Sequence, residues 1–123
     1  MKKDIILYTE NLQKHFGLDA GFFAKKNKQV YAVNGVSFEI ERGKTYGLVG
    51  ESGCGKTTTA RLLVRMYNAD SGKIYFNPQE KTEPIEVANL DKKALSAYRE
   101  KVKYIFQDPS RSLNPRMTIA SIL

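Results

Sequence analysis

Residues 50–57 constrain the fold of this chain more than any other segment. They read Gly-Glu-Ser-Gly-Cys-Gly-Lys-Thr and fit the phosphate-binding loop pattern G-x-x-x-x-G-K-[ST] without a mismatch. Glycines in such a loop let successive backbone N–H groups turn inward around a polyphosphate, and the following helix directs its positive end at the anion. The pattern requires a strand before the loop and a helix after it. The apolar run at residues 45–49 predicts the strand, and residues 57–66 predict the helix.

The side chains of this loop indicate separate roles. Lys56 is spaced to reach the terminal phosphates of a nucleotide, and the Thr57 hydroxyl is suited to ligate Mg²⁺. The simpler alternative is a glycine-rich turn with an incidental lysine, but it does not account for the order of strand, loop and helix. We therefore expect a phosphate site that consists of Gly50, Glu51, Ser52, Gly53, Cys54, Gly55, Lys56, Thr57 and Thr58.

The composition is that of one soluble globular domain. With 123 residues, 41% of them hydrophobic and 27% charged, the chain has room for one core and not for two. No apolar run approaches the ~20 residues that span a bilayer, and the first apolar stretch is too short for a secretion signal. The single cysteine, Cys54, excludes an internal disulfide and, with the loop motif, favours a reducing cytoplasmic setting.

The net charge of +7 raises the question of a nucleic-acid partner. The basic residues form short clusters without aromatic residues spaced for base stacking, so a solvated surface is the preferred interpretation. Contact with acidic lipid headgroups or with a partner protein remains open, and no nucleic-acid partner is expected. The clustered residues are Lys25, Lys26, Lys28, Lys92, Lys93, Arg99, Lys101 and Lys103.

Periodicity and turn residues predict the remaining elements. Strands are expected at residues 5–12, 32–40, 73–76 and 102–106, with turns at residues 41–44 and 69–72. Asp91 is placed to cap a helix over residues 92–101, whose apolar face is Ala94, Leu95, Tyr98 and Val102. Residues 117–123 begin a further helix.

Three segments together resemble ABC transporter ATPases. They are residues 48–58, which include the loop, residues 70–74 (Asp-Ser-Gly-Lys-Ile), and residues 105–119 (Ile-Phe-Gln-Asp-Pro-Ser-Arg-Ser-Leu-Asn-Pro-Arg-Met-Thr-Ile). The last segment resembles the ATP-binding subunits of oligopeptide and dipeptide importers in particular. Importers for nickel and for some sugars carry similar segments, so the transported solute stays open. The resemblance extends from Asn34 to the last residue.

This resemblance implies an α/β fold: the N-terminal portion of a P-loop nucleotide-binding domain, with a small antiparallel β subdomain. Gln107 matches the Q-loop glutamine, whose neutral amide reaches Mg²⁺ and the attacking water without adding charge beside phosphates. Phe16 matches best the aromatic residue that stacks on adenine, with Phe22, Phe23 and Tyr31 as rivals. Lys56 and Gln107 are the implied catalytic residues, Thr57 and Gln107 the implied metal ligands, and ATP and Mg²⁺ the implied cofactors.

The resemblance also implies partners and a location. They are a second ABC ATPase subunit, two membrane-spanning permease subunits and, indirectly, an extracytoplasmic solute-binding protein, at the cytoplasmic face of the cell membrane. The 123 residues contain no L-S-G-G-Q signature, no hydrophobic strand that ends in Asp-Glu and no switch histidine. We therefore expect residues 1–123 to be the N-terminal part of one nucleotide-binding domain, which binds ATP but does not hydrolyse it alone.

Three competing interpretations are weaker. A strand at residues 104–106 followed by Asp108 would imitate a Walker B strand, but Lys103 interrupts the apolar run and no Glu follows Asp108. A GTPase or small kinase would share the loop, but the near match to N-K-x-D at residues 27–30 lacks the Asp and precedes the loop. A non-enzymatic adaptor would be indicated by a damaged loop, and this loop is intact.

Overall fold

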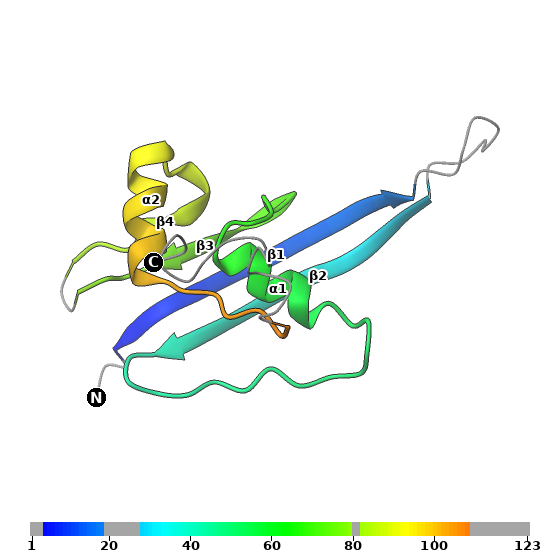
Figure 1. Ribbon diagram of the computed structural model, residues 1–123, viewed down its shortest axis with the longest axis horizontal. Coiled ribbons are helices and arrows are strands. Elements are labelled where there is room, and N and C mark those ends of the chain that lie inside the picture. Colours follow the sequence, from blue (N-terminus) through cyan, green and yellow to red (C-terminus); the bar gives the residue numbers. More distant parts are fainter. Residues whose placement is uncertain (1–3, 19–27, 80–81, 109–123) are drawn as a thin grey trace, which may run out of the picture.

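A four-stranded antiparallel sheet forms the centre of the molecule, and two helices pack on it (Figure 1). The computed structural model describes residues 4–18, 28–79 and 82–108. The strand order is β2-β1-β3-β4, so β1 lies between β2 and β3. The elements are β1 (Ile5–Leu18), β2 (Lys28–Glu41), α1 (Lys56–Leu63), β3 (Ser71–Phe76), β4 (Ile85–Glu86), the 3₁₀ turn η1 (Val87–Asn89) and α2 (Lys92–Lys101).

The hydrophobic core lies between one face of the sheet and the two helices. Leu12 of β1 and Leu62 of α1 are fully buried, and Tyr98 of α2 packs edge-on against Phe76 of β3. Because α1 and α2 share this one core, their positions relative to the sheet are fixed by packing. The buried members of the core are Leu12, Val33, Leu62, Ile74, Phe76, Val87 and Tyr98.

The long β1–β2 ribbon has four register shifts, and bulges at Asn11 and Gly35 accompany two of them. Asn11 has a φ of 46° and Gly35 a φ of 68°, and the register of the two strands shifts between Thr9 and Leu12. Each bulge interrupts the alternation of side chains, so Leu12 and Val36 become partners facing the core. The strands are longer than the sequence predicted because the ribbon continues past these bulges.

Helix α2 holds the end of α1. The Tyr98 hydroxyl donates a hydrogen bond to the carbonyl oxygen of Leu63, and the Arg99 guanidinium donates to those of Val64 (3.3 Å) and Arg65 (2.7 Å). These carbonyls follow the last turn of α1 and have no partner within the helix. Burial raises the pKa of Tyr98 to about 12, so its hydroxyl stays a donor at neutral pH.

Two of the predicted strands are wrong. Residues 45–49 and 102–106 run without strand pairing in the described part of the chain, and Val49 and Ile105 are both 90% exposed. An apolar run becomes a buried strand only where neighbouring strands accept its backbone hydrogen bonds, and the described strands offer none here. Residues 42–55 instead form a long loop from the end of β2 to α1 (Figure 1).

Other predictions are confirmed. The Asp91 carboxylate accepts a hydrogen bond from the Ala94 N–H at 2.8 Å, which caps α2 as expected. The turn around Gly43 is present, and β3 ends at Phe76 before Asn77. Helix α1 is shorter than predicted, ending at Leu63. The helix expected at residues 117–123 lies outside the described residues.

Gly72 allows β3 to begin close against the β1 bulge. Its φ is 82°, and a Cβ added there would lie 2.3 Å from the carbonyl oxygen of Asn11. Both the left-handed backbone and the close approach exclude a larger residue at this position.

We predict that Gly72→Ala lowers the free energy of unfolding by roughly 2–4 kcal/mol, because strain at φ and a backbone clash add. Urea denaturation followed by circular dichroism measures it. Gly17→Ala is the matched control, since a Cβ at Gly17 would meet no atom within 4 Å. Equal stability of the two variants would contradict the packing of β3 against the bulge.

Asp70 joins β1 to the turn before β3. Its carboxylate lies 3.0 Å from the Lys14 Nζ, and it accepts hydrogen bonds from the backbone N–H of His15 at 2.7 Å and from Lys14. The His15 hydrogen bond, and then the Lys14 ammonium, lower the pKa of Asp70 below its usual value. His15 is therefore a structural neighbour of Asp70.

A lowered pKa stabilises the fold above the unfolded pKa of about 4, and this stabilisation is lost as the pH falls through the lower, folded value. We predict that Asp70→Asn costs about 1 kcal/mol at pH 7 and that the difference from the parent vanishes near pH 2. Urea titrations at several pH values test this. A difference that stays constant down to pH 2 would show that the charge of Asp70 contributes nothing.

Candidate functional site

The phosphate-binding loop is closed at its C-terminal end by a glycine in contact with the sheet. Gly55 precedes α1 with a φ of 94°, and a Cβ there would lie 2.0 Å from the carbonyl oxygen of Ala32 in β2. Gly53 also has a positive φ, of 80°. These two glycines let the loop turn sharply into α1 and seat the start of this helix directly on β2.

Lys56 folds back across the loop. Its Nζ donates hydrogen bonds to the carbonyl oxygens of Gly50, at 2.6 Å, and Glu51, and it lies 3.6 Å from the Cys54 Sγ. A turn with a hydrogen bond from the Cys54 N–H to the Glu51 carbonyl closes the loop further. The ammonium is thus held at the mouth of the loop, where an anion would meet it.

The hydroxyls that follow Lys56 differ in their surroundings. The Thr59 hydroxyl donates to the Gly55 carbonyl at 3.0 Å, and this residue is buried. Thr57 is exposed, at the first turn of α1, and Thr58 is half-buried. Thr57 therefore presents its hydroxyl oxygen to solvent beside the positive end of the helix.

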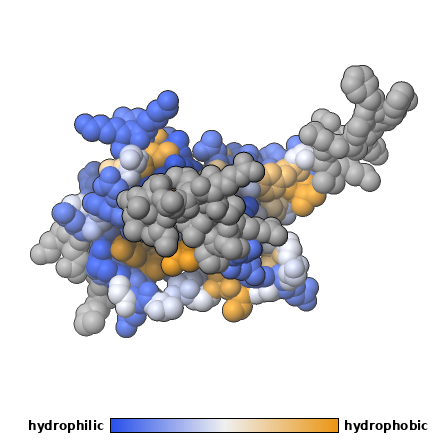
Figure 2. Space-filling model, in the orientation of Figure 1, coloured by the Kyte–Doolittle hydropathy of each residue, from blue (hydrophilic) through white to orange (hydrophobic). Residues whose placement is uncertain are grey.

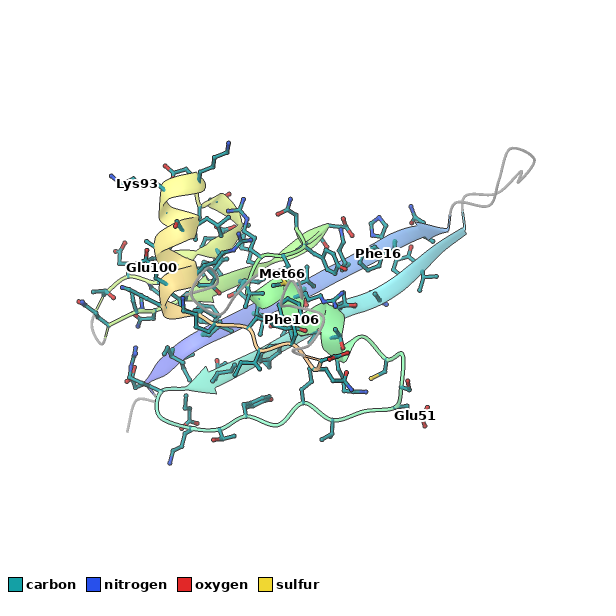
Figure 3. The ribbon with its side chains drawn as sticks, in the orientation of Figure 1. Phe16, Glu51, Met66, Lys93, Glu100 and Phe106 are labelled. Atoms are coloured by element: carbon teal, nitrogen blue, oxygen red, sulfur yellow. The ribbon has the colours of Figure 1, made fainter. Side chains whose placement is uncertain are left out.

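Thr57 and Gln107 line the same open pocket, although 50 positions separate them in the sequence. The pocket has a volume of about 960 Å³, and the segment that carries Phe106 crosses in front of α1 (Figure 3). Both predicted magnesium ligands therefore face one space. The residues that line it are Thr57, Arg61, Tyr104, Ile105, Phe106, Gln107 and Asp108.

Two neutral side chains, Thr57 and Gln107, bring oxygen ligands to this pocket, and the Asp108 carboxylate also lines it. Within the described ranges no three His, Cys, Asp or Glu residues lie together in a way that would hold a metal ion. A hydroxyl and an amide oxygen suit Mg²⁺, which usually keeps several waters and takes further ligands from substrate phosphates. The arrangement thus fits a magnesium ion that binds together with a nucleotide.

Phe16 is not brought to the loop. Its ring packs edge-on against Tyr67 with centroids 5.4 Å apart, and the Lys14 Nζ lies 5.4 Å from the ring centroid. Figure 3 shows Phe16 on the far half of β1, well separated from Glu51 in the loop. The Phe16 residue is 37% exposed.

Of the rivals of Phe16, only Tyr31 lies within the described residues. Tyr31 is exposed and packs against the His15 ring at 5.9 Å, while Phe22 and Phe23 lie outside the described residues. The adenine assignment stays a prediction.

Sequence reasoning missed Arg61. It lines the pocket with Thr57 and Gln107 and lies one helical turn after Thr57 on α1. That spacing of four residues from a loop threonine was the signal available in the sequence.

Hydrophobic side chains reach the surface near this site. Tyr46, Leu48 and Val49 are exposed in the loop that leads to α1, and Tyr46 stacks on Phe38 of β2. Figure 2 shows hydrophobic residues between hydrophilic ones on the face that carries this loop. No helix in the described part of the chain is both long and apolar enough to cross a membrane.

Comparison with known proteins agrees with the geometry. A family model described as ABC transporter matches residues 33–122. The oligopeptide transport ATP-binding protein AppF of Bacillus subtilis is 40% identical over 122 residues, which are 98% of this chain and 35% of AppF. The dipeptide transport ATP-binding protein DppF of Haemophilus influenzae is 42% identical over 118 residues, 96% of this chain and 34% of DppF.

A solved structure supports the fold. A dimeric ATP-binding cassette in a post-hydrolysis state, bound to ADP and Pi, superimposes with a TM-score of 0.61 at 21% identity, covering 76% of this chain and 35% of that one. The predicted fold class is confirmed. The chain spans about a third of the length of the relatives it matches.

Proposed function

Since this chain belongs to the ABC transporter family, we propose that it is the nucleotide-binding part of an ATPase subunit that energises import of oligopeptides or dipeptides. The observation that carries the proposal is the single pocket shared by Thr57 and Gln107 at the start of α1. The relatives named as oligopeptide and dipeptide transport ATP-binding proteins support the solute class.

The loop would bind the phosphates of ATP. Backbone N–H groups of residues 51–57 and the positive end of α1 attract the anion, and Lys56 supplies a cation already held at the mouth of the loop. When phosphate oxygens arrive, they replace the carbonyl oxygens of Gly50 and Glu51 as partners of this ammonium or share it with them. Charge neutralisation at this point is the main binding contribution of a side chain.

Thr57 and Gln107 would hold Mg²⁺ with the nucleotide. When bound there, the ion neutralises charge that develops on the transferred phosphoryl group. The Gln107 amide also has N–H donors, so it can orient a water beside the metal while its oxygen ligates. The exposed Phe16 ring is the proposed adenine platform, which requires its segment and the loop to approach one another around the ligand.

Turnover belongs to the whole transporter in this proposal. Hydrolysis would need a strand ending in Asp-Glu, a switch histidine and the signature of a second ABC ATPase subunit, none of which the 123 residues contain. Residues 1–123 would form the N-terminal part of one nucleotide-binding domain that binds ATP. Two permease subunits at the cytoplasmic face of the membrane, with a solute-binding protein outside, would complete the assembly.

We predict that Lys56→Ala lowers the affinity for Mg-ATP at least about 100-fold while the fold is kept, because the ammonium meets the phosphates and lies outside the core. Isothermal titration calorimetry measures the affinity. Lys93→Ala, on the exposed face of α2, removes the same charge and serves as the control. Unchanged affinity in Lys56→Ala would refute the assignment of the loop.

A further inference from the structure

Arg61 lines the pocket that the two proposed magnesium ligands share. It follows Thr57 by one turn of α1 and lines the same pocket as Gln107. We propose that Arg61 is a positioning residue that holds the segment of Tyr104 against α1, so that the Gln107 amide faces Thr57. The inference rests on the proposed function, since it assigns a role within the proposed Mg-ATP site.

The Arg61 guanidinium is held by the Tyr67 hydroxyl and lines the same pocket as Tyr104. Its Nη1 donates to the Tyr67 hydroxyl at 3.1 Å, and its Cζ lies 5.8 Å from the centroid of the Tyr67 ring. Hydrogen bonds to Tyr67 and, second, to Tyr104 raise the pKa of Arg61. A planar guanidinium can serve both partners at once because its N–H groups diverge in one fixed plane.

Arg61 is half-buried, and its position leaves one of its donors without a partner in the described part of the chain. Its Nε atom is buried and has no hydrogen-bond partner in the described part of the chain. A buried donor without an acceptor is unfavourable, and a solvent-facing arginine would avoid it. The chain tolerates this arrangement where the guanidinium contacts both tyrosines.

Tyr104 transmits this contact to Gln107. The Tyr104 ring packs edge-on against Phe106 with centroids 4.8 Å apart, and Phe106 directly precedes Gln107. Residues 103–106 belong to no strand of the described sheet, so ladder hydrogen bonds do not set their position. In the described part of the chain, side-chain packing therefore connects α1 to Gln107 through Arg61, Tyr104 and Phe106.

A direct contact of Arg61 with ATP is the alternative. It would strengthen nucleotide binding with or without a metal, because a guanidinium attracts phosphate in either case. A positioning role predicts something different: only the gain in affinity that Mg²⁺ provides depends on Arg61.

Isothermal titration of ATP, in EDTA and in excess Mg²⁺, separates the two roles on the 123-residue chain. The ratio of the two dissociation constants defines the magnesium gain. We expect Arg61→Gln to lower this gain about tenfold, as for other residues that orient a metal ligand. The affinity for ATP in EDTA should change less than about twofold, because a substitution away from the nucleotide has only a small effect on binding.

Three further variants make the test specific. Tyr104→Phe keeps the charge and removes only the hydroxyl, so it should also lower the magnesium gain. In the double variant, the effects of Tyr104→Phe and Arg61→Gln on the gain should not add. In a Gln107→Ala background, Arg61→Gln should leave the gain unchanged. Arg99→Gln is the control, because Arg99 holds the residues that follow α1 and does not line the pocket; it should lower stability and leave the gain intact.

Each other outcome overturns the inference. Equal losses in EDTA and in Mg²⁺ would show a direct contact with ATP or a purely structural role. A loss of gain that persists in the Gln107→Ala background would show that Arg61 acts without Gln107. If Arg61→Gln fails to fold, Tyr104→Phe decides alone, and an unchanged gain there refutes the inference. A parent chain that binds no ATP would instead refute the proposed function itself.

Discussion

The contact between Gly55 and the backbone of Ala32 sets where α1 begins, and the candidate site depends on that position. A Cβ at Gly55 would lie 2.0 Å from the Ala32 carbonyl oxygen, so only glycine allows this approach. At its other end, α1 is held by Tyr98 and Arg99 of α2. Because α2 is followed at once by the segment that carries Gln107, one helix fixed at both ends connects the loop to the opposite side of the pocket.

The chemistry of the site follows from charge. Backbone N–H groups, the Lys56 ammonium and the start of α1 are all positive, and the pocket adds the neutral oxygens of Thr57 and Gln107. Such a site suits a ligand that brings its own negative charge and a divalent cation, as Mg-ATP does.

Local signals in the sequence predicted what depends on local chemistry. The helix that follows the loop, the Asp91 cap and the turn at Gly43 each follow from a few neighbouring residues, whereas Ser71 and Gly72 of the predicted turn at residues 69–72 belong to β3. The strands at residues 45–49 and 102–106 were predicted wrongly, because hydrophobicity indicates a segment able to pair and says nothing of whether a partner strand is present. The bulges at Asn11 and Gly35 were not predicted, because the register is a property of two strands together. The place of Arg61 in the pocket was not predicted, because Tyr67 and Tyr104 become its neighbours only after folding.

The most direct test of the account uses Cys54, the single cysteine of the chain, which is exposed and whose Sγ lies 3.6 Å from the Lys56 Nζ. Its rate of alkylation by a small thiol reagent is measured with and without Mg-ATP, in the parent and in Lys56→Ala. If the loop binds the phosphates of ATP, nucleotide at ten times its dissociation constant should slow alkylation of the parent by about tenfold, as the unbound fraction falls. Lys56→Ala should show no protection. Alkylation of the parent at the same rate with and without Mg-ATP would contradict the central claim that this loop is a nucleotide site.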